Sequence, residues 1–153
     1  MMTEPHHLGY LLNKVTLLLK RELSKKLIAN DITPSQWAVL QDLYMQEMLS
    51  EEERENTPAH IAERIFADRP TVSGILNRLS TKGLIQVRPN PADRRSQVIS
   101  LTQEAKKLLP SLQNDAEAVL SQAVMGLPDE QLQPLTNALL SMIRNLELGE
   151  TSQ

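Results

Sequence analysis

Apolar residues recur at intervals of three and four along most of the chain, which predicts a mainly helical protein. The clearest stripe lies mid-chain, at Val72, Ile75, Leu76 and Leu79. Asp68 can cap the start of this helix, and Pro70 suits its first turn because the missing N–H costs nothing there. Gly83 tolerates the left-handed conformation that commonly ends a helix. The pattern therefore predicts one amphipathic helix between Asp68 and Gly83.

Four further helices are expected around this one, on the same criteria of apolar spacing and end signals. Their ranges are Leu8 to Ala29, Pro34 to about Met48, Gln103 to about Met125 and Asp129 to about Leu148. Residues 1–7 are expected to form a polar lead-in. Pro110 falls inside the third of these ranges and should bend that helix or force a local adjustment.

A short helix over Pro58 to Phe66, capped by Thr57, precedes the central helix. Its inward positions are expected to be Ile61, Ala62, Ile65 and Phe66.

Two short strands should follow the central helix. The first begins at Leu84 and Ile85, and the second runs from Gln97 to Leu101. A turn rich in proline, asparagine and aspartate separates them and carries Arg94 and Arg95 at its tip. The order helix, turn, helix, hairpin is that of a winged helix. The expected fold class is thus mainly α with a small β-hairpin wing.

Positive charge is concentrated on this central unit. Residues 69–100 hold six Lys or Arg residues and one acid, a net charge of +5, whereas the whole chain carries −3 and the remainder therefore −8. A basic segment inside an acidic protein indicates a local anionic partner, with nucleic acid the first choice.

Four short sequence segments carry a family resemblance: TPSQWAVL (33–40), DRPTVSGILNRLSTKGLI (68–85), DRRSQVISLT (93–102) and LLP (108–110). Together, and in this order, they resemble the multiple-antibiotic-resistance regulator (MarR) family of bacterial and archaeal transcription factors. The resemblance implies one domain over residues 1–153, with a winged-helix lobe at 33–101. Terminal helices at 8–29 and 102–148 would form the dimerisation region.

The resemblance also implies a cytoplasmic homodimeric repressor that binds double-stranded DNA at a pseudo-palindromic operator. The alternative is a winged helix that binds a protein partner and does not bind DNA. Clustered arginines argue against that alternative, since a surface without DNA does not need them.

Roles on DNA follow from side-chain chemistry. Thr71, Ser73 and the helix N-terminus suit phosphates, whereas Asn77 and Arg78 suit base edges or phosphates. Arg69 adds charge at the helix start, and Arg94 and Arg95 suit the minor groove. The family has an Asp-x-Arg pattern at the wing, which falls on Asp93 and Arg95; Asp93 could orient its basic neighbours or simply bond the turn backbone.

Two features depart from the family. Gly74 stands where relatives often carry a long polar or basic side chain, so base readout there should differ. The acidic segment at residues 50–56 lengthens a usually shorter loop; we expect a solvated extension that points away from the DNA.

A small anionic or phenolic effector is a further implication of the resemblance. Candidate contacts lie on or near the first two helices, although each could equally be a packing or surface residue: His7, Tyr10, Lys14, Trp37 and Tyr44.

Other classes of chemistry find little support. The chain has no cysteine, which excludes disulfides, thiolate nucleophiles and thiol-based redox sensing. The adjacent His6 and His7 suit a loop better than a metal site, and neither metal nor cofactor is expected. No catalytic motif occurs, and no leader or membrane-spanning apolar run is recognisable, so an enzyme or a membrane protein is not expected.

Overall fold

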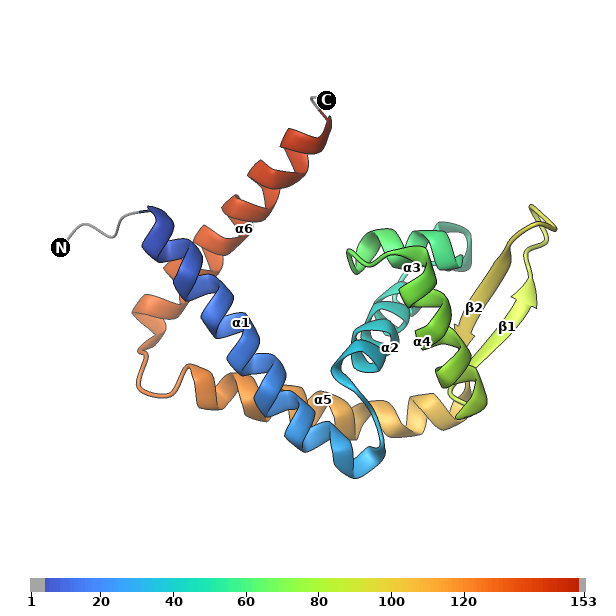
Figure 1. The fold of residues 1–153 in the computed structure, drawn as a ribbon, viewed down its shortest axis with the longest axis horizontal. Coiled ribbons are helices and arrows are strands. Elements are labelled where there is room, and N and C mark those ends of the chain that lie inside the picture. The colour runs from blue at the N-terminus through green and yellow to red at the C-terminus, as the bar shows by residue number, and fades with distance from the viewer. Residues whose placement is uncertain (1–4, 152–153) are drawn as a thin grey trace. The chain divides into compact units, whose positions relative to one another are not determined.

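The computed structural model describes residues 5–151 and is mainly helical with one β-hairpin, as predicted (Figure 1). The chain divides into two compact units, Met1–Glu117 and Ala118–Gln153. The first contains α1 (Pro5–Leu27), η1 (Ile28–Asn30), α2 (Pro34–Glu47), η2 (Glu51–Glu53), α3 (Pro58–Arg64), α4 (Arg69–Thr81), β1 (Ile85–Pro89) and β2 (Gln97–Leu101). Helix α5 (Gln103–Ala123) begins in the first unit and ends in the second, which also contains α6 (Asp129–Thr151).

The helix boundaries follow the expected signals closely. Side-chain oxygens of Thr33, Thr57 and Asp68 accept hydrogen bonds from N–H groups in the first turns of α2, α3 and α4. In each helix a proline follows the cap, where its fixed φ favours helix initiation. Helix α1 begins at Pro5 rather than Leu8, so the expected loop at residues 5–7 is wrong, and residues 1–4 lie outside the described range. Helix α5 continues through Pro110 without interruption.

The hairpin pairs β1 and β2 antiparallel, from Ile85 opposite Leu101 to Pro89 opposite Gln97. The N–H of Ile99 donates to the carbonyl oxygen of Asn56 at 2.9 Å, so the chain just before α3 extends the ladder by one bond. That bond joins the middle of β2 to the chain just before α3.

One apolar core holds the first unit together. Fully buried side chains come from α1, α2, α3, α4, α5 and β2, and the largest include Leu40, Leu43, Ile61, Leu79 and Ile99. The predicted stripe of α4 is buried in this core along its whole length. Burial of one face fixes which residues of α4 face solvent, and this positions the candidate DNA-binding side chains.

Phe66 contradicts the inward position expected from the helical pattern. Helix α3 ends at Arg64, and Phe66 is 81% exposed with a φ of 55°. Its N–H donates to the carbonyl of Glu63, and the N–H of Ala67 donates to that of Ala62. These two bonds define a Schellman motif, which turns residue 66 out of the helical period and away from the core.

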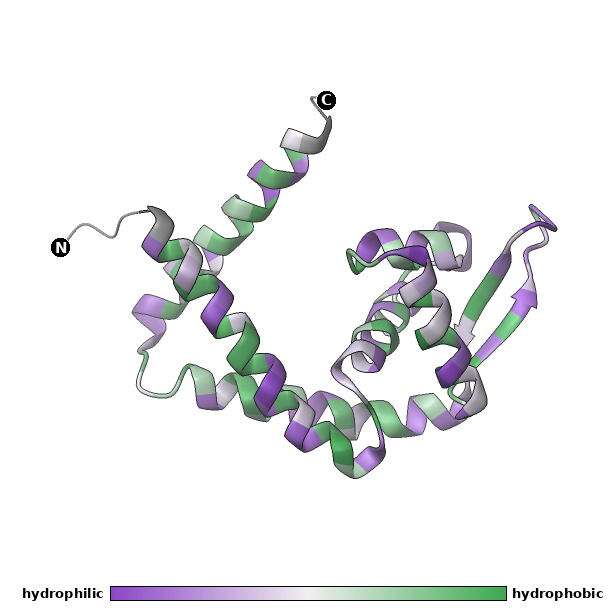
Figure 2. Ribbon diagram, viewed as in Figure 1, coloured by the Kyte–Doolittle hydropathy of each residue, from purple (hydrophilic) through white to green (hydrophobic). Residues whose placement is uncertain are grey.

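Two helices carry broad exposed apolar faces. In the second unit, Figure 2 shows hydrophobic positions recurring along α6, and the exposed ones include Leu135, Leu139, Leu140, Ile143 and Leu146. In the first unit, the exposed apolar residues of α1 are Leu8, Tyr10, Leu11, Val15, Leu17 and Leu18. Within residues 5–151, none of the helices combines the length and apolar character needed to cross a membrane.

Candidate nucleic-acid interface

The solvent face of α4 presents the predicted DNA-binding residues together. Arg69, Thr71, Ser73, Asn77 and Arg78 are all exposed, whereas the intervening apolar positions are buried. Because the buried stripe anchors the helix, these polar side chains share one fixed face. The helix and its turn after α3 therefore have the form of a helix-turn-helix reading unit.

The N-terminus of α4 already holds an anion. An oxygen of the Asp68 carboxylate accepts the Thr71 N–H at 2.7 Å. Hydrogen bonds from the backbone and then the hydroxyl of Thr71 lower the pKa of Asp68 below its ordinary value. A phosphate at this end of the helix would compete with the carboxylate for the N–H and the hydroxyl of Thr71.

The tip of the hairpin is a structured turn. Asn90 pairs with Ser96 through a backbone bond of 3.1 Å and a side-chain bond of 2.9 Å, and its carboxamide oxygen accepts the Ala92 N–H. The turn therefore presents Arg94 and Arg95 from a defined backbone.

Asp93 makes contacts of both kinds that the sequence left open, one to the turn backbone and one to a basic neighbour. Its Oδ1 accepts the backbone N–H of Arg95 at 3.0 Å and the guanidinium Nε of the same residue at 3.3 Å. The Arg95 side chain is nevertheless 93% exposed. One carboxylate thus closes the turn and orients a guanidinium that remains open to a partner.

Comparison with known proteins identifies this architecture. The MarR family model matches residues 32–97, which include α2, α3, α4 and most of the hairpin. This segment of the chain, residues 32–97, is of the MarR family.

The curated relatives are described as helix-turn-helix (HTH) type transcriptional regulators. The HTH-type transcriptional regulator YfiV of Bacillus subtilis is 32% identical over 87 residues, which span 57% of this chain and 54% of YfiV. The HTH-type transcriptional repressor NicR of Pseudomonas putida is 37% identical over 62 residues, 39% of each chain. The crystal structure of the MepR–DNA complex of S. aureus matches with a TM-score of 0.78 and 26% identity, covering 95% of this chain and 99% of MepR. The alignments with YfiV and NicR thus span about half or less of the lengths of those two relatives.

Within this MarR fold, Gly74 lies partly exposed on α4 next to Ser73, and a Cβ at that position would meet open space. The missing side chain is therefore not required by packing. At residue 74 this chain therefore has no side chain that could contact a base directly.

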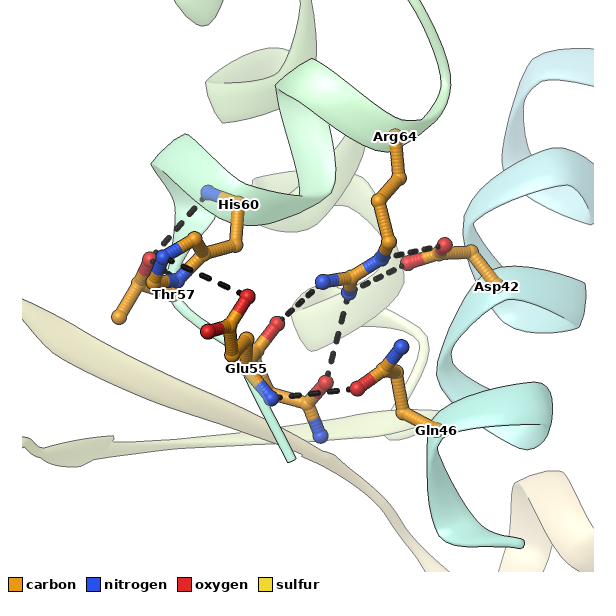
Figure 3. A network of polar contacts seen from close by, with 7 residues as sticks. Asp42, Gln46, Glu55, Thr57, His60 and Arg64 are labelled. Atoms are coloured by element: carbon orange, nitrogen blue, oxygen red, sulfur yellow. Dashed lines mark hydrogen bonds and ion pairs between the residues drawn. The ribbon is translucent and has the colours of Figure 1, made fainter. Parts of the chain in front are cut away.

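A polar network that the sequence did not predict links α2 to α3 (Figure 3). The Arg64 guanidinium donates to both carboxylate oxygens of Asp42 at 2.8 and 2.9 Å, and also to the backbone carbonyl of Glu55. It lies within 3.5 Å of the Asn56 amide oxygen, and Gln46 accepts the Glu55 N–H at 3.1 Å. The network joins α2, the loop and α3. Its partners are up to 22 positions apart, so local sequence patterns gave no signal for it.

The acidic segment is only in part the predicted solvated extension. Glu51, Glu52 and Glu53 are exposed in η2, but Asn56 is buried against β2. A hollow of about 630 Å³ is lined both by this segment and by hairpin residues such as Arg88. Whether the segment faces away from DNA stays a prediction.

The candidate effector residues do not gather in one place. Trp37 is a core residue, Tyr44 packs partly buried against the core, and His7, Tyr10 and Lys14 are exposed along α1. A cavity of about 480 Å³ instead lies between α1, α2 and the α3–α4 turn, lined by Lys20, Ser35, Phe66, Thr71 and other residues. Sequence reasoning missed Lys20 and Phe66 because the fold, not their spacing, brings them together. In residues 5–151 no three His, Asp or Glu side chains cluster as a metal site would require.

Proposed function

We propose that this chain is a sequence-specific DNA-binding transcriptional regulator of the MarR family. The supporting observation is the pairing of an exposed polar face on α4 with a wing whose Arg95 is oriented by Asp93. In this proposal α4 enters the major groove, where Asn77 and Arg78 read base edges. Thr71, Ser73 and Arg69 contact phosphates, and Arg94 and Arg95 reach the adjacent minor groove.

We further propose a homodimer. The lobe at residues 33–101 would bind DNA, and helices within 8–29 and 102–148 would form the dimer, because α1 and α6 expose leucine-rich faces that a second copy could bury. A two-fold dimer would place two α4 helices on half-sites about one helical turn apart. Repression is the mode of action we favour, as in the relative NicR, and DNA binding would place the protein in the cytoplasm.

Release by a small anionic or phenolic effector completes the proposal. The cavity beside α4 offers one cation, Lys20, and one aromatic ring, Phe66, next to Thr71. A ligand bound there would touch both α1 and the start of α4, so it could shift the population of DNA-binding conformations. The α1 residues His7, Tyr10 and Lys14, with Trp37 and Tyr44, remain weaker candidates.

Fluorescence anisotropy on DNA upstream of the protein's own gene tests DNA recognition directly. We expect the wild type to bind this duplex more tightly than random DNA, and the Arg94→Ala/Arg95→Ala variant to lose most of that affinity. Binding to the upstream duplex no tighter than to random DNA would place the operator elsewhere. Absence of binding to any duplex at low salt would favour the protein-interaction alternative, and a monomeric mass at micromolar concentration would exclude the dimer.

A further inference from the structure

Lys82 reaches from the end of α4 to a distant part of the chain. Its backbone caps the helix, and its amino group approaches two residues that precede it by about fifty positions. The Nζ donates to the backbone carbonyl of Asp31 and to the Gln36 Oε1 at 2.9 Å, and it lies 3.5 Å from the Asp31 carboxylate. Only 25% of the Lys82 side chain is exposed. These contacts fasten the C-terminal end of α4.

The acceptors belong to the junction between α1 and α2. Gln36 is 4% exposed and takes part in the capping box of α2, in which its Oε1 accepts the Thr33 N–H at 3.2 Å. Asp31 has a φ of 55° and ends η1, with its N–H bonded to Ile28. The amino group of Lys82 therefore docks on backbone and amide oxygens whose positions are set by two helix ends.

The neighbouring residues of Lys82 on α4 are the candidate base readers. Asn77 and Arg78 share a hollow of about 420 Å³ with Asp31, Gln36 and Lys82. The ammonium group donates to two oxygens of the α1–α2 junction and lies 3.5 Å from a third, on the Asp31 carboxylate, so its contacts are with the protein's own oxygens. Although Lys82 is one of the six cations of the basic segment, its charge is used inside the lobe.

We infer that Lys82 is a positioning residue that sets the orientation of α4 relative to the α1–α2 junction and so fixes how Asn77 and Arg78 meet DNA. The inference rests on the proposed function, since it assigns α4 to DNA reading. On the other side, the Thr102 hydroxyl donates to the Gly83 carbonyl at 2.7 Å, so the end of α4 is held from two directions. Loss of Lys82 releases one of them.

A direct phosphate contact is the competing role for a lysine at this place. The two roles differ in salt dependence, because each phosphate contact contributes about 0.9 to the slope of log K against log salt. A positioning residue contributes nothing to that slope. It changes instead the preference for the specific sequence over random DNA.

The test uses full-length protein and a duplex that the wild type selects from a randomised library. Lys82→Met removes the charge and keeps the apolar stem, and Lys107→Met, at an exposed lysine of α5, is the matched control. We expect Lys82→Met to weaken binding to the selected duplex roughly tenfold, the usual cost of one misread base pair. Affinity for random DNA and the salt slope should stay as in the wild type, and Lys107→Met should match the wild type throughout.

A second readout concerns the two halves of the selected duplex. Inserting one base pair between them should weaken wild-type binding more than it weakens binding of Lys82→Met, because a loosened α4 tolerates the change. If Lys82→Met does not fold, as judged by circular dichroism, Lys82→Gln replaces it and the same results are expected.

The possible results separate the inference from the proposed function. A slope lowered by about 0.9 or more assigns Lys82 to phosphate and overturns the inference. Unchanged affinity for the selected duplex overturns it as well. A wild type that binds no duplex contradicts the proposed function and the inference with it.

Discussion

Phe66 and Gly83 occupy the same position of the same helix-ending motif, and their φ angles are 55° and 74°. The N–H of Phe66 bonds to Glu63 and that of Gly83 to Ser80, while the next residue in each case bonds to the carbonyl five positions earlier. Glycine reaches this left-handed region without strain, whereas a residue with a Cβ does not. The ends of α3 and α4 thus have the same backbone geometry, with a phenylalanine in the left-handed position of one and a glycine in that of the other.

Replacing Phe66 with glycine should therefore stabilise the protein. Relief of the left-handed strain gives about 1–2 kcal/mol, and the greater freedom of glycine in the unfolded chain offsets about 0.5–1 kcal/mol of it. We expect a net gain of about 0.5–1 kcal/mol in the free energy of unfolding, measured by urea denaturation at fixed protein concentration. Gly83→Ala should show the opposite sign. A loss of stability in Phe66→Gly would mean that the exposed ring makes a stabilising contact.

The Arg64–Asp42 pair should contribute strongly to stability. Arg64 and Asp42 are 25% and 12% exposed at the side chain, so removal of either leaves a poorly solvated charge. We expect Arg64→Ala to lower the free energy of unfolding by roughly 2–3 kcal/mol.

The double variant Asp42→Ala/Arg64→Ala should lose less than the sum of the single losses, because residues in contact are not additive. Glu63→Ala, an exposed neighbour on α3, is the control and should stay within about 0.5 kcal/mol of the wild type. Additive losses would show that the pair does not act as a unit.

The cap of α4 should make stability depend on pH in a defined direction. Because the pKa of Asp68 is lowered in the folded state, its ionised form stabilises the fold above the ordinary aspartate pKa. This contribution is lost as the pH falls through the lowered pKa. Thermal melts from neutral to acidic pH should show a smaller acid dependence in Asp68→Asn, whose side-chain oxygen still caps the helix. Equal acid dependence in the variant and the wild type would contradict this role.

Asp93→Ala should distinguish the orientation of Arg95 by Asp93 from the effect of the Asp93 negative charge on DNA binding. The substitution removes an acid, so electrostatics alone would strengthen binding to DNA. If Asp93 orients Arg95 as the two bonds to its Oδ1 indicate, operator affinity should fall several-fold, by about 1 kcal/mol or less, instead. Anisotropy with Asp93→Ala and Arg95→Ala measures both effects, and tighter binding by Asp93→Ala would exclude an orienting role.

Features with local causes could be predicted from the sequence. Thr33, Thr57 and Asp68 cap helices because a side-chain oxygen three residues before an N–H needs no distant partner. The buried stripe of α4 and the paired strands followed from periodicity in the same way.

Features that depend on long-range contacts could not be predicted. Nothing in the sequence pattern indicated the contacts that Arg64 and Lys82 make inside the lobe, because oxygen partners of these residues lie 22 and 51 positions away. The prediction that Phe66 is buried was wrong for a different reason. It assumed that the helical period continues to residue 66, but the helix ends two residues earlier. Likewise Trp37 could not be distinguished as a core residue or an effector contact until α2 was placed against the core.

The salt dependence of DNA binding tests the central claim most directly. On an operator duplex, log K should fall linearly with log salt, with a slope of about −0.9 for each phosphate contacted. The Arg94→Ala/Arg95→Ala variant should show a shallower slope, by about 0.9 for each arginine that contacts a phosphate. Binding that is indifferent to salt would contradict the assignment of α4 and the wing to DNA, and equal slopes for variant and wild type would contradict the assignment of the wing.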